Sequence, residues 1–170
     1  ASGLLPVTSG PHGVPRPLSD IIDMLRSTEE YEDEADLLER VGQLLRSRLG
    51  ALSVAFGPAD DPDTSLVAAG AGRGAGAGRA LAAGVLIGPL RTSAGVEIAA
   101  PIRCGGATVG ALGCRWSAAG PDNADHARAL IATTAVVSGA FLKAIVDRRR
   151  VRPPEADCPE YFGYRDGFLS

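Results

Sequence analysis

Cysteine is the residue type here with the greatest capacity for nucleophilic or redox chemistry, and the chain has three: Cys104, Cys114 and Cys158. A thiolate is a nucleophile, and two neighbouring thiols can form a disulfide. A hairpin turning at Gly105-Gly106 places Cys104 and Cys114 about seven residues apart along its length, or roughly 24 Å. Because a disulfide needs Cα atoms within about 7 Å, we expect no bridge between them. Cys114 is most simply a small core residue.

Metal binding has few candidates. The two histidines, His12 and His126, lie outside any metal-ligand spacing, and the cysteines show no C-x-x-C spacing. Asp60, Asp61 and Asp63 could hold a divalent ion through oxygens, but an Asp-Asp-Pro-Asp run is typical of a solvated turn. We therefore expect no metal and no cofactor, and we expect His126 to be a surface residue.

The run at residues 70–80, GAGRGAGAGRA, repeats the G-x-G spacing of phosphate-binding loops. No third glycine falls at the G-x-G-x-x-G offset, no Lys-Ser/Thr pair follows, and no βαβ pattern surrounds the run. Its composition is that of a flexible connector. We therefore expect an exposed loop there.

The composition is that of one globular domain with extensions, because 45% of the 170 residues are hydrophobic and 22% are charged. The net charge of −3 gives no basic bias, so direct binding of nucleic acid is not expected. We see no signal peptide and no apolar run near about 18 residues. These observations predict a cytoplasmic protein with no membrane partner.

Residues 96–116, VEIAAPIRCGGATVGALGCRW, organise the chain, because they predict two apolar strands joined by a tight turn. Glycine supplies the positive φ angles that such turns need. A polar turn at residues 117–121 follows, and then a helix from about Asn123 to Arg149. Its apolar residues populate more than one face, so we expect burial against the sheet and against a second surface.

The first half of the chain supplies the remaining elements. Apolar residues at helical spacing predict helices at 18–26 and 35–49, the second ended by Gly50. Residues 51–56 and 65–69 predict two paired strands, and the apolar run at 85–87 predicts another strand within 81–90.

The Pro-Ile pair at 101–102, the V-G-x-L-G pattern at 109–113 and the closing helix resemble the C-terminal half of GAF domains, small-molecule-sensing and dimerisation modules of bacterial signalling proteins. The resemblance covers about residues 34–147. It implies an α/β (α+β) fold, with an antiparallel sheet of about five or six strands and the N- and C-terminal helices packed on one face. We divide the chain into a linker or tail (1–17), a GAF-like domain (18–149) and a Pro/aromatic tail or the start of a following segment (150–170).

In ligand-binding GAF domains the ligand lies between the sheet and a segment inserted between the early hairpin and the central one. Here that insert spans only residues 70–95, much of it Gly and Ala, which leaves little wall for a cavity of several hundred Å³. Haem, bilin or cyclic-nucleotide binding is therefore not carried over. If a pocket survives, its polar lining would come from Arg73, Arg79, Arg91, Glu97 and Arg103, which are otherwise ordinary solvated charges.

The resemblance implies a non-catalytic regulatory module that forms a homodimer through its terminal helices. Such a module responds to a small-molecule effector and signals to the output domain of a larger cytoplasmic protein, such as a transcriptional regulator or a sensor kinase. Two alternatives stay open. One is a cysteine-dependent reductase, because some GAF domains reduce free methionine sulfoxide. The other is a purely structural assembly module whose pocket has closed.

The segment after the last helix holds four of the eight aromatic side chains of the chain: Tyr161, Phe162, Tyr164 and Phe168. Such a cluster is costly to leave in water. We expect it either to dock on this domain or to begin the next one.

Overall fold

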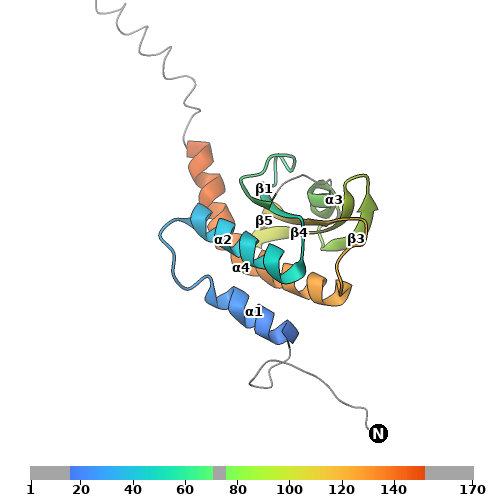
Figure 1. Ribbon diagram of the computed structural model, residues 1–170. Helices are drawn as coiled ribbons and strands as arrows, with labels where there is room; N and C mark the ends of the chain where they lie inside the picture. Colours follow the sequence, from blue (N-terminus) through green and yellow to red (C-terminus); the bar gives the residue numbers. More distant parts are fainter. Residues whose placement is uncertain (1–15, 71–75, 152–170) are drawn as a thin grey trace, which may run out of the picture.

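A computed structural model describes residues 16–70 and 76–151 of the chain (Figure 1). Five strands form one antiparallel sheet in the order β2-β1-β5-β4-β3. Helices α1, α2 and α4 lie on one side of this sheet and α3 lies on the other (Figure 1). The predicted α+β architecture is confirmed. The elements are α1 (Arg16–Arg26), α2 (Glu34–Leu49), β1 (Ser53–Pro58), β2 (Val67–Gly70), α3 (Gly76–Ala83), β3 (Ile87–Thr92), β4 (Gly95–Cys104), β5 (Ala107–Trp116) and α4 (Ala124–Val151).

Local sequence signals place the boundaries of α2. The Asp33 side chain accepts a hydrogen bond from the Ala35 amide at 2.8 Å, which satisfies one of the free amides of the first turn. Gly50 ends the helix in the left-handed region at φ 63°. The indole of Trp116 then donates to the Leu49 carbonyl at 2.9 Å, which joins the end of α2 to the sheet.

The central hairpin is the one that the sequence predicts. Cys104 pairs with Ala107, and the two intervening glycines take φ values of 61° and 83°. Neither glycine has another atom near the position of a Cβ, so the turn needs glycine for its backbone angles alone. The hairpin supplies the two longest strands, β4 and β5.

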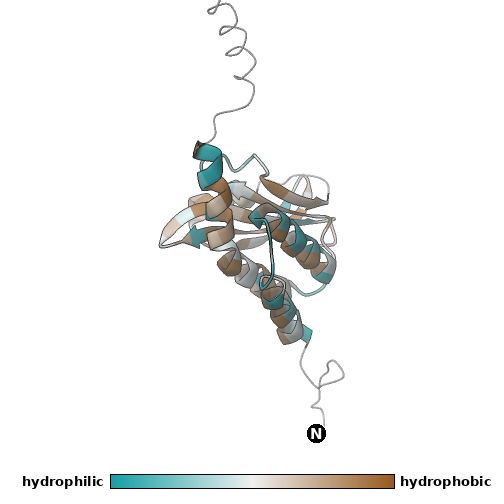
Figure 2. Cartoon of the chain, turned by 90° about the vertical axis from the view of Figure 1, so that its left-hand side faces the viewer, coloured by the Kyte–Doolittle hydropathy of each residue, from teal (hydrophilic) through white to brown (hydrophobic). Residues whose placement is uncertain are grey.

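The main core lies between the sheet and α2 and α4. Alternate residues of the three central strands point into it, and their side chains are almost completely buried: Val54, Phe56, Ile98, Ala100, Ile102, Leu112, Cys114 and Trp116. The burial of Cys114 confirms its prediction as a core residue. In Figure 2 apolar colouring runs along much of the helices, and the last turns of α4 become hydrophilic.

Helix α4 lies unusually close to the two central strands. A Cβ on Gly139 would overlap the carbonyl oxygen of Arg103, and a Cβ on Gly110 would overlap the Leu142 side chain. We expected no long apolar run, but α4 is long and apolar enough to cross a membrane by length and composition alone. In this fold its buried residues, including Leu130 and Ile131, belong to the core.

Helix α1 is held by a buried carboxylate. Asp20 is 1% exposed and accepts from Arg48 of α2 at 3.0 Å and from the Nε2 of His126 of α4 at 2.9 Å. The prediction of a surface role for His126 is therefore wrong, because its ring is largely buried in this contact. The bond between His126 and Asp20 joins residues far apart in the sequence, so no local sequence pattern could indicate it.

Two further predictions need correction. The exposed loop expected at residues 70–80 is in part the helix α3, which begins at Gly76. The apolar run at 85–87 is not a strand centre, because β3 starts only at Ile87 and Val85 is 59% exposed. The predicted paired strands and helices are otherwise present, with ends shifted by a few residues.

Both edges of the sheet are short or interrupted. Strand β2 has only four residues. At the other edge, the register of β3 shifts between Ile87 and Leu90, and Pro89 has no amide hydrogen to offer.

Candidate functional site

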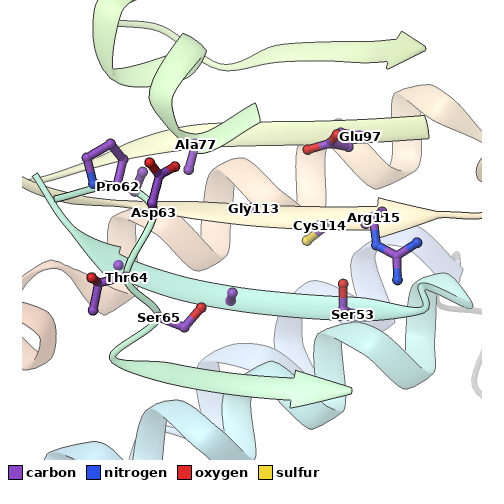
Figure 3. Close-up of a pocket in the computed structure, with 13 residues that line it drawn as sticks. Ser53, Pro62, Asp63, Thr64, Ser65, Ala77, Glu97, Gly113, Cys114 and Arg115 are labelled. Atoms are coloured by element: carbon purple, nitrogen blue, oxygen red, sulfur yellow. The ribbon is translucent and has the colours of Figure 1, made fainter. Parts of the chain in front are cut away.

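A pocket lies on the sheet face opposite α2 and α4, with α3 and the β1–β2 loop around it (Figure 3). Its floor consists of residues that alternate with the core positions on β1 and β5: Ser53, Ala55, Gly57, Ala111, Gly113 and Arg115. Four of these six are alanine or glycine, so the strands fill little of the space above them. A Cβ on Gly113 would meet no atom within 4 Å, which shows that the floor opens into free space.

One end of the pocket is polar. Arg115 of β5 pairs with Ser53 of β1 on one side and with Glu97 of β4 on the other. Strand neighbours on one face lie within about 5.5 Å of each other, so these three side chains form a row across the sheet. Figure 3 shows Ser53, Arg115 and Glu97 together at this end, and Arg115 also donates to the Ala94 carbonyl at 2.9 Å.

Glu97 connects the wall of the pocket to its floor. The side chain is 4% exposed, and its Oε1 accepts from the amide of Gly76, the first residue of α3, at 2.8 Å. Its Oε2 accepts from the hydroxyl of Thr92 on β3 at 2.6 Å. A carboxylate at a helix N-terminus is favoured by the free amides and the helix dipole. The absence of a Cβ at Gly76 lets α3 approach the sheet, because a Cβ there would lie 3.1 Å from Glu97 Oε1.

The other end of the pocket is formed by residues 62–65 of the β1–β2 loop. Asp63 is exposed there, and Figure 3 shows it far along the floor from Arg115. Thr64 donates its hydroxyl to Asp61 at 2.5 Å, which orders the turn that we predicted for this acidic run. The pocket thus has an exposed carboxylate at the β1–β2 loop and, at its other end, Arg115 beside the buried carboxylate of Glu97.

The cavity measures about 280 Å³. Small-molecule sites are usually about 300–1,000 Å³, so this one is at the lower limit of that range. We expected little room because the insert is short and rich in Gly and Ala. The structure shows that the room comes mainly from small residues of the sheet, with walls from the β1–β2 loop and, in the described part of the insert, from Ala77 of α3.

Of the five polar residues considered from the sequence, Glu97 lines this pocket. Arg91 donates instead to the Ala118 carbonyl at 3.1 Å, and Arg103 donates to the Gly84 carbonyl. Arg79 is exposed on α3, and Arg73 lies outside the described residues. Sequence reasoning missed Arg115 and Ser53, and it considered Asp63 only as a metal ligand. The alternation of alanine and glycine on β1 and β5 was the available signal.

Cys114 is among the residues that line the pocket (Figure 3), but it is 2% exposed. Burial raises the pKa of the Cys114 thiol far above its usual range, and the side chain belongs to the core. Cys104 pairs with Ala107 at the turn, whereas Cys114 pairs with Ile98 well along the hairpin. Among residues 16–70 and 76–151, no three His, Cys, Asp or Glu side chains cluster as a metal site would require.

No protein-family model and no curated protein sequence matches the chain. Solved structures do. Free methionine-R-sulfoxide reductase from Neisseria meningitidis, solved with its substrate, superposes with a TM-score of 0.62 at 17% identity, covering 86% of this chain and 98% of that one. The GAF domain of an Acinetobacter phosphoenolpyruvate-protein phosphotransferase gives 0.65 at 9% identity, covering 77% and 95%. At such identities the likeness concerns architecture alone, and on that evidence the chain has a GAF-like fold.

Proposed function

We propose that this chain is a non-catalytic regulatory module of a larger cytoplasmic protein, which pairs through its helical layer and transmits the state of its pocket along α4. The observation that carries the proposal is the contact of α4 with β4 and β5. On one face β5 provides half of the pocket floor and β4 contributes Glu97, and α4 lies directly against both strands on the other face.

The contact is close because glycine stands at both meeting points. Gly139 of α4 faces the backbone of Arg103, and Gly110 of β5 faces Leu142 of α4. Close-packed surfaces have no slack to absorb a displacement. A small-molecule effector that shifted β4 or β5 would therefore move α4 with them.

A stripe of α4 points to solvent, and it is apolar. We call it the α4 stripe: Ala129, Ala132, Val136 and Ala140, all exposed. Their spacing puts them on one helix face, and Val136 is 79% exposed. The neighbouring helix α1 also exposes Leu18 and Leu25, at 49% and 44%. A symmetric pair of chains would bury such a surface against its own copy.

In this mechanism the pair has two arrangements of its helices, and an effector binds one better than the other. The ligand can shift the equilibrium only by the difference in its two affinities. A small rotation or shift of packed helices is a usual form of such a transition. An output domain attached beyond the helices would then respond.

The test is sedimentation equilibrium of the chain and of two matched variants. We expect a dimer for the chain itself, and we expect Val136→Glu to weaken it roughly tenfold or more, because that costs at least about 1.4 kcal/mol of association. Val85→Glu is the control, since Val85 is also an exposed valine but lies near α3, away from the α4 stripe. A monomer at every concentration, or equal weakening by both variants, would remove the proposal.

The rival function is a cysteine-dependent reductase, favoured by the likeness to the Neisseria enzyme. It requires a thiol that can ionise, whereas Cys114 is buried with a raised pKa and lies far along the hairpin from Cys104. The chain should be incubated with free methionine sulfoxide and a reductant. Turnover that disappears in Cys104→Ser or Cys114→Ser would establish the rival, and no turnover in the unmodified chain would dispose of it.

A third reading, a structural assembly module, would keep the dimer and lack an effector. Gly113→Phe separates it from a sensor, because a side chain there fills the pocket from its open floor. Binding of an effector should be abolished by this change while the dimer persists. An assembly module would bind no effector in either form, so the unmodified chain and the variant would behave alike.

A further inference from the structure

A second hollow lies at the opposite end of α4 from its first turn, between the last turns of that helix and the β1–β2 loop. It measures about 270 Å³. Pro58, Leu66 and Val146 form its apolar part. We call this hollow the exit groove, because its lining residue Arg150 stands next to Val151, the last residue of α4.

Charges flank the apolar part of the exit groove on two sides. Asp60 and Asp61 come from the β1–β2 loop, and Arg149 and Arg150 come from α4. Arg148, the preceding residue, is already paired with Glu34 at 2.7 Å. Arg149 and Arg150 are exposed, and among the described residues no ion pair is recorded for either of them.

The chain that follows α4 has the matching chemistry. Residues 152–170, RPPEADCPEYFGYRDGFLS, hold two arginines and four acids, and three of the acids precede Tyr161 and Phe162. Each aromatic side chain buries about 150–250 Å² when it is covered. Nine residues separate Val151 from Tyr161, enough to span about 30 Å when extended.

We propose that residues 152–170 return to this domain and seat Tyr161 and Phe162 in the exit groove. Pro153 and Pro154 provide the change of direction, because proline cannot continue a helix. The acids before Tyr161 then lie against Arg149 and Arg150, and the rings cover Leu66 and Val146. The occupant is the same chain's own segment, because it leaves α4 at the groove and carries the opposite charge to the helix end.

The test uses the full chain with a nitroxide on Cys158, three residues before Tyr161. Cys104 is first changed to serine, and Cys114 is too buried to react. In amide NMR spectra, we expect the signals of Leu66 and Val146 to lose more than half of their intensity relative to the reduced label. The Ala119 amide is the internal control, because it precedes α4 and lies about 40 Å from its far end.

Two sets of variants sharpen the result. Tyr161→Ser with Phe162→Ser should restore the Leu66 and Val146 signals, and both changes lie outside residues 16–70 and 76–151. Arg149→Glu with Arg150→Glu should restore them in part, whereas Arg79→Glu, an exposed arginine on α3, should leave the broadening intact. Broadening that survives the aromatic double variant would overturn the assignment of these rings.

A mixed sample identifies the source of the segment. Isotope-labelled chains without nitroxide are combined with unlabelled chains that carry it. No broadening in this mixture, with broadening in the single sample, supports docking within one chain. Equal broadening in the mixture assigns the groove to a second copy, and no broadening in either sample rejects docking altogether. Either of the last two results would overturn the proposal.

Discussion

The two faces of the central sheet differ in how the same strands fill the space above them. Toward α2 and α4, β1 and β5 present Phe56, Leu112 and Trp116, which are at most 2% exposed. Toward α3, the residues between them are mainly alanine and glycine, and a pocket of about 280 Å³ remains. Successive side chains of a strand point to opposite faces, so one strand can fill the core with one set of alternate positions and leave space for a pocket with the other.

The comparison teaches that the size of side chains, as well as their polarity, marks a site on a sheet. The pocket floor has few charges, and its volume is simply what small residues leave unfilled. On the core face, by contrast, Gly110 and Gly139 have no room for a Cβ. The comparison makes three predictions about substitutions in and beside β5.

The largest effect should follow removal of bulk from the core face. Leu112→Ala should lower the free energy of unfolding by about 3 kcal/mol, because it deletes a fully buried side chain and leaves a cavity behind. Urea denaturation followed by circular dichroism measures this. A loss below about 1 kcal/mol would mean that this face is packed no better than the pocket face.

The next effect compares two glycines of one strand. Gly110→Ala should cost about 2 kcal/mol, because its new methyl meets the Gly57 backbone and the Leu142 side chain. Gly113→Ala should leave stability unchanged or raise it by about 0.5 kcal/mol, because its methyl enters open space. Equal losses in the two variants would contradict the difference between the faces.

The smallest effect concerns the attachment of α3. Glu97→Gln should cost about 1 kcal/mol, because a neutral amide oxygen replaces the charged acceptor of the Gly76 amide and the new NH2 group cannot accept from the Thr92 hydroxyl. Hydrogen exchange should then quicken in α3 while the β4–β5 ladder stays protected. Thr92→Val is the control, since it removes the bond to Oε2 and leaves the charged acceptor of the Gly76 amide in place. Unchanged exchange in α3 would show that other contacts hold this helix.

The sequence was sufficient for the elements whose signals are local. The hairpin followed from Gly105-Gly106, and α2 followed from its apolar stripe and the glycine after it. Helix α3 could not be found in this way, because a Gly/Ala-rich run has no apolar stripe. Its first amide is held by Glu97, which lies 21 residues further along the chain. A tertiary contact thus overrides a weak local preference.

The site was harder to predict than the fold for a similar reason. We considered charged lining residues of the insert and of the strand after it, and of that set only Glu97 reaches the pocket among the residues described. Arg91 and Arg103 bind backbone carbonyls elsewhere. Which face of a strand receives α2 and α4 depends on the whole assembly, so small residues at alternate positions are informative only once that face is known.

The edges of the sheet also bear on aggregation. A long, regular outer strand offers free amides and carbonyls to any extended chain in a crowded solution. Here β2 is too short, and β3 carries Pro89 at its register shift, so neither side offers a regular row of donors. Aggregation by pairing of edge strands is therefore disfavoured.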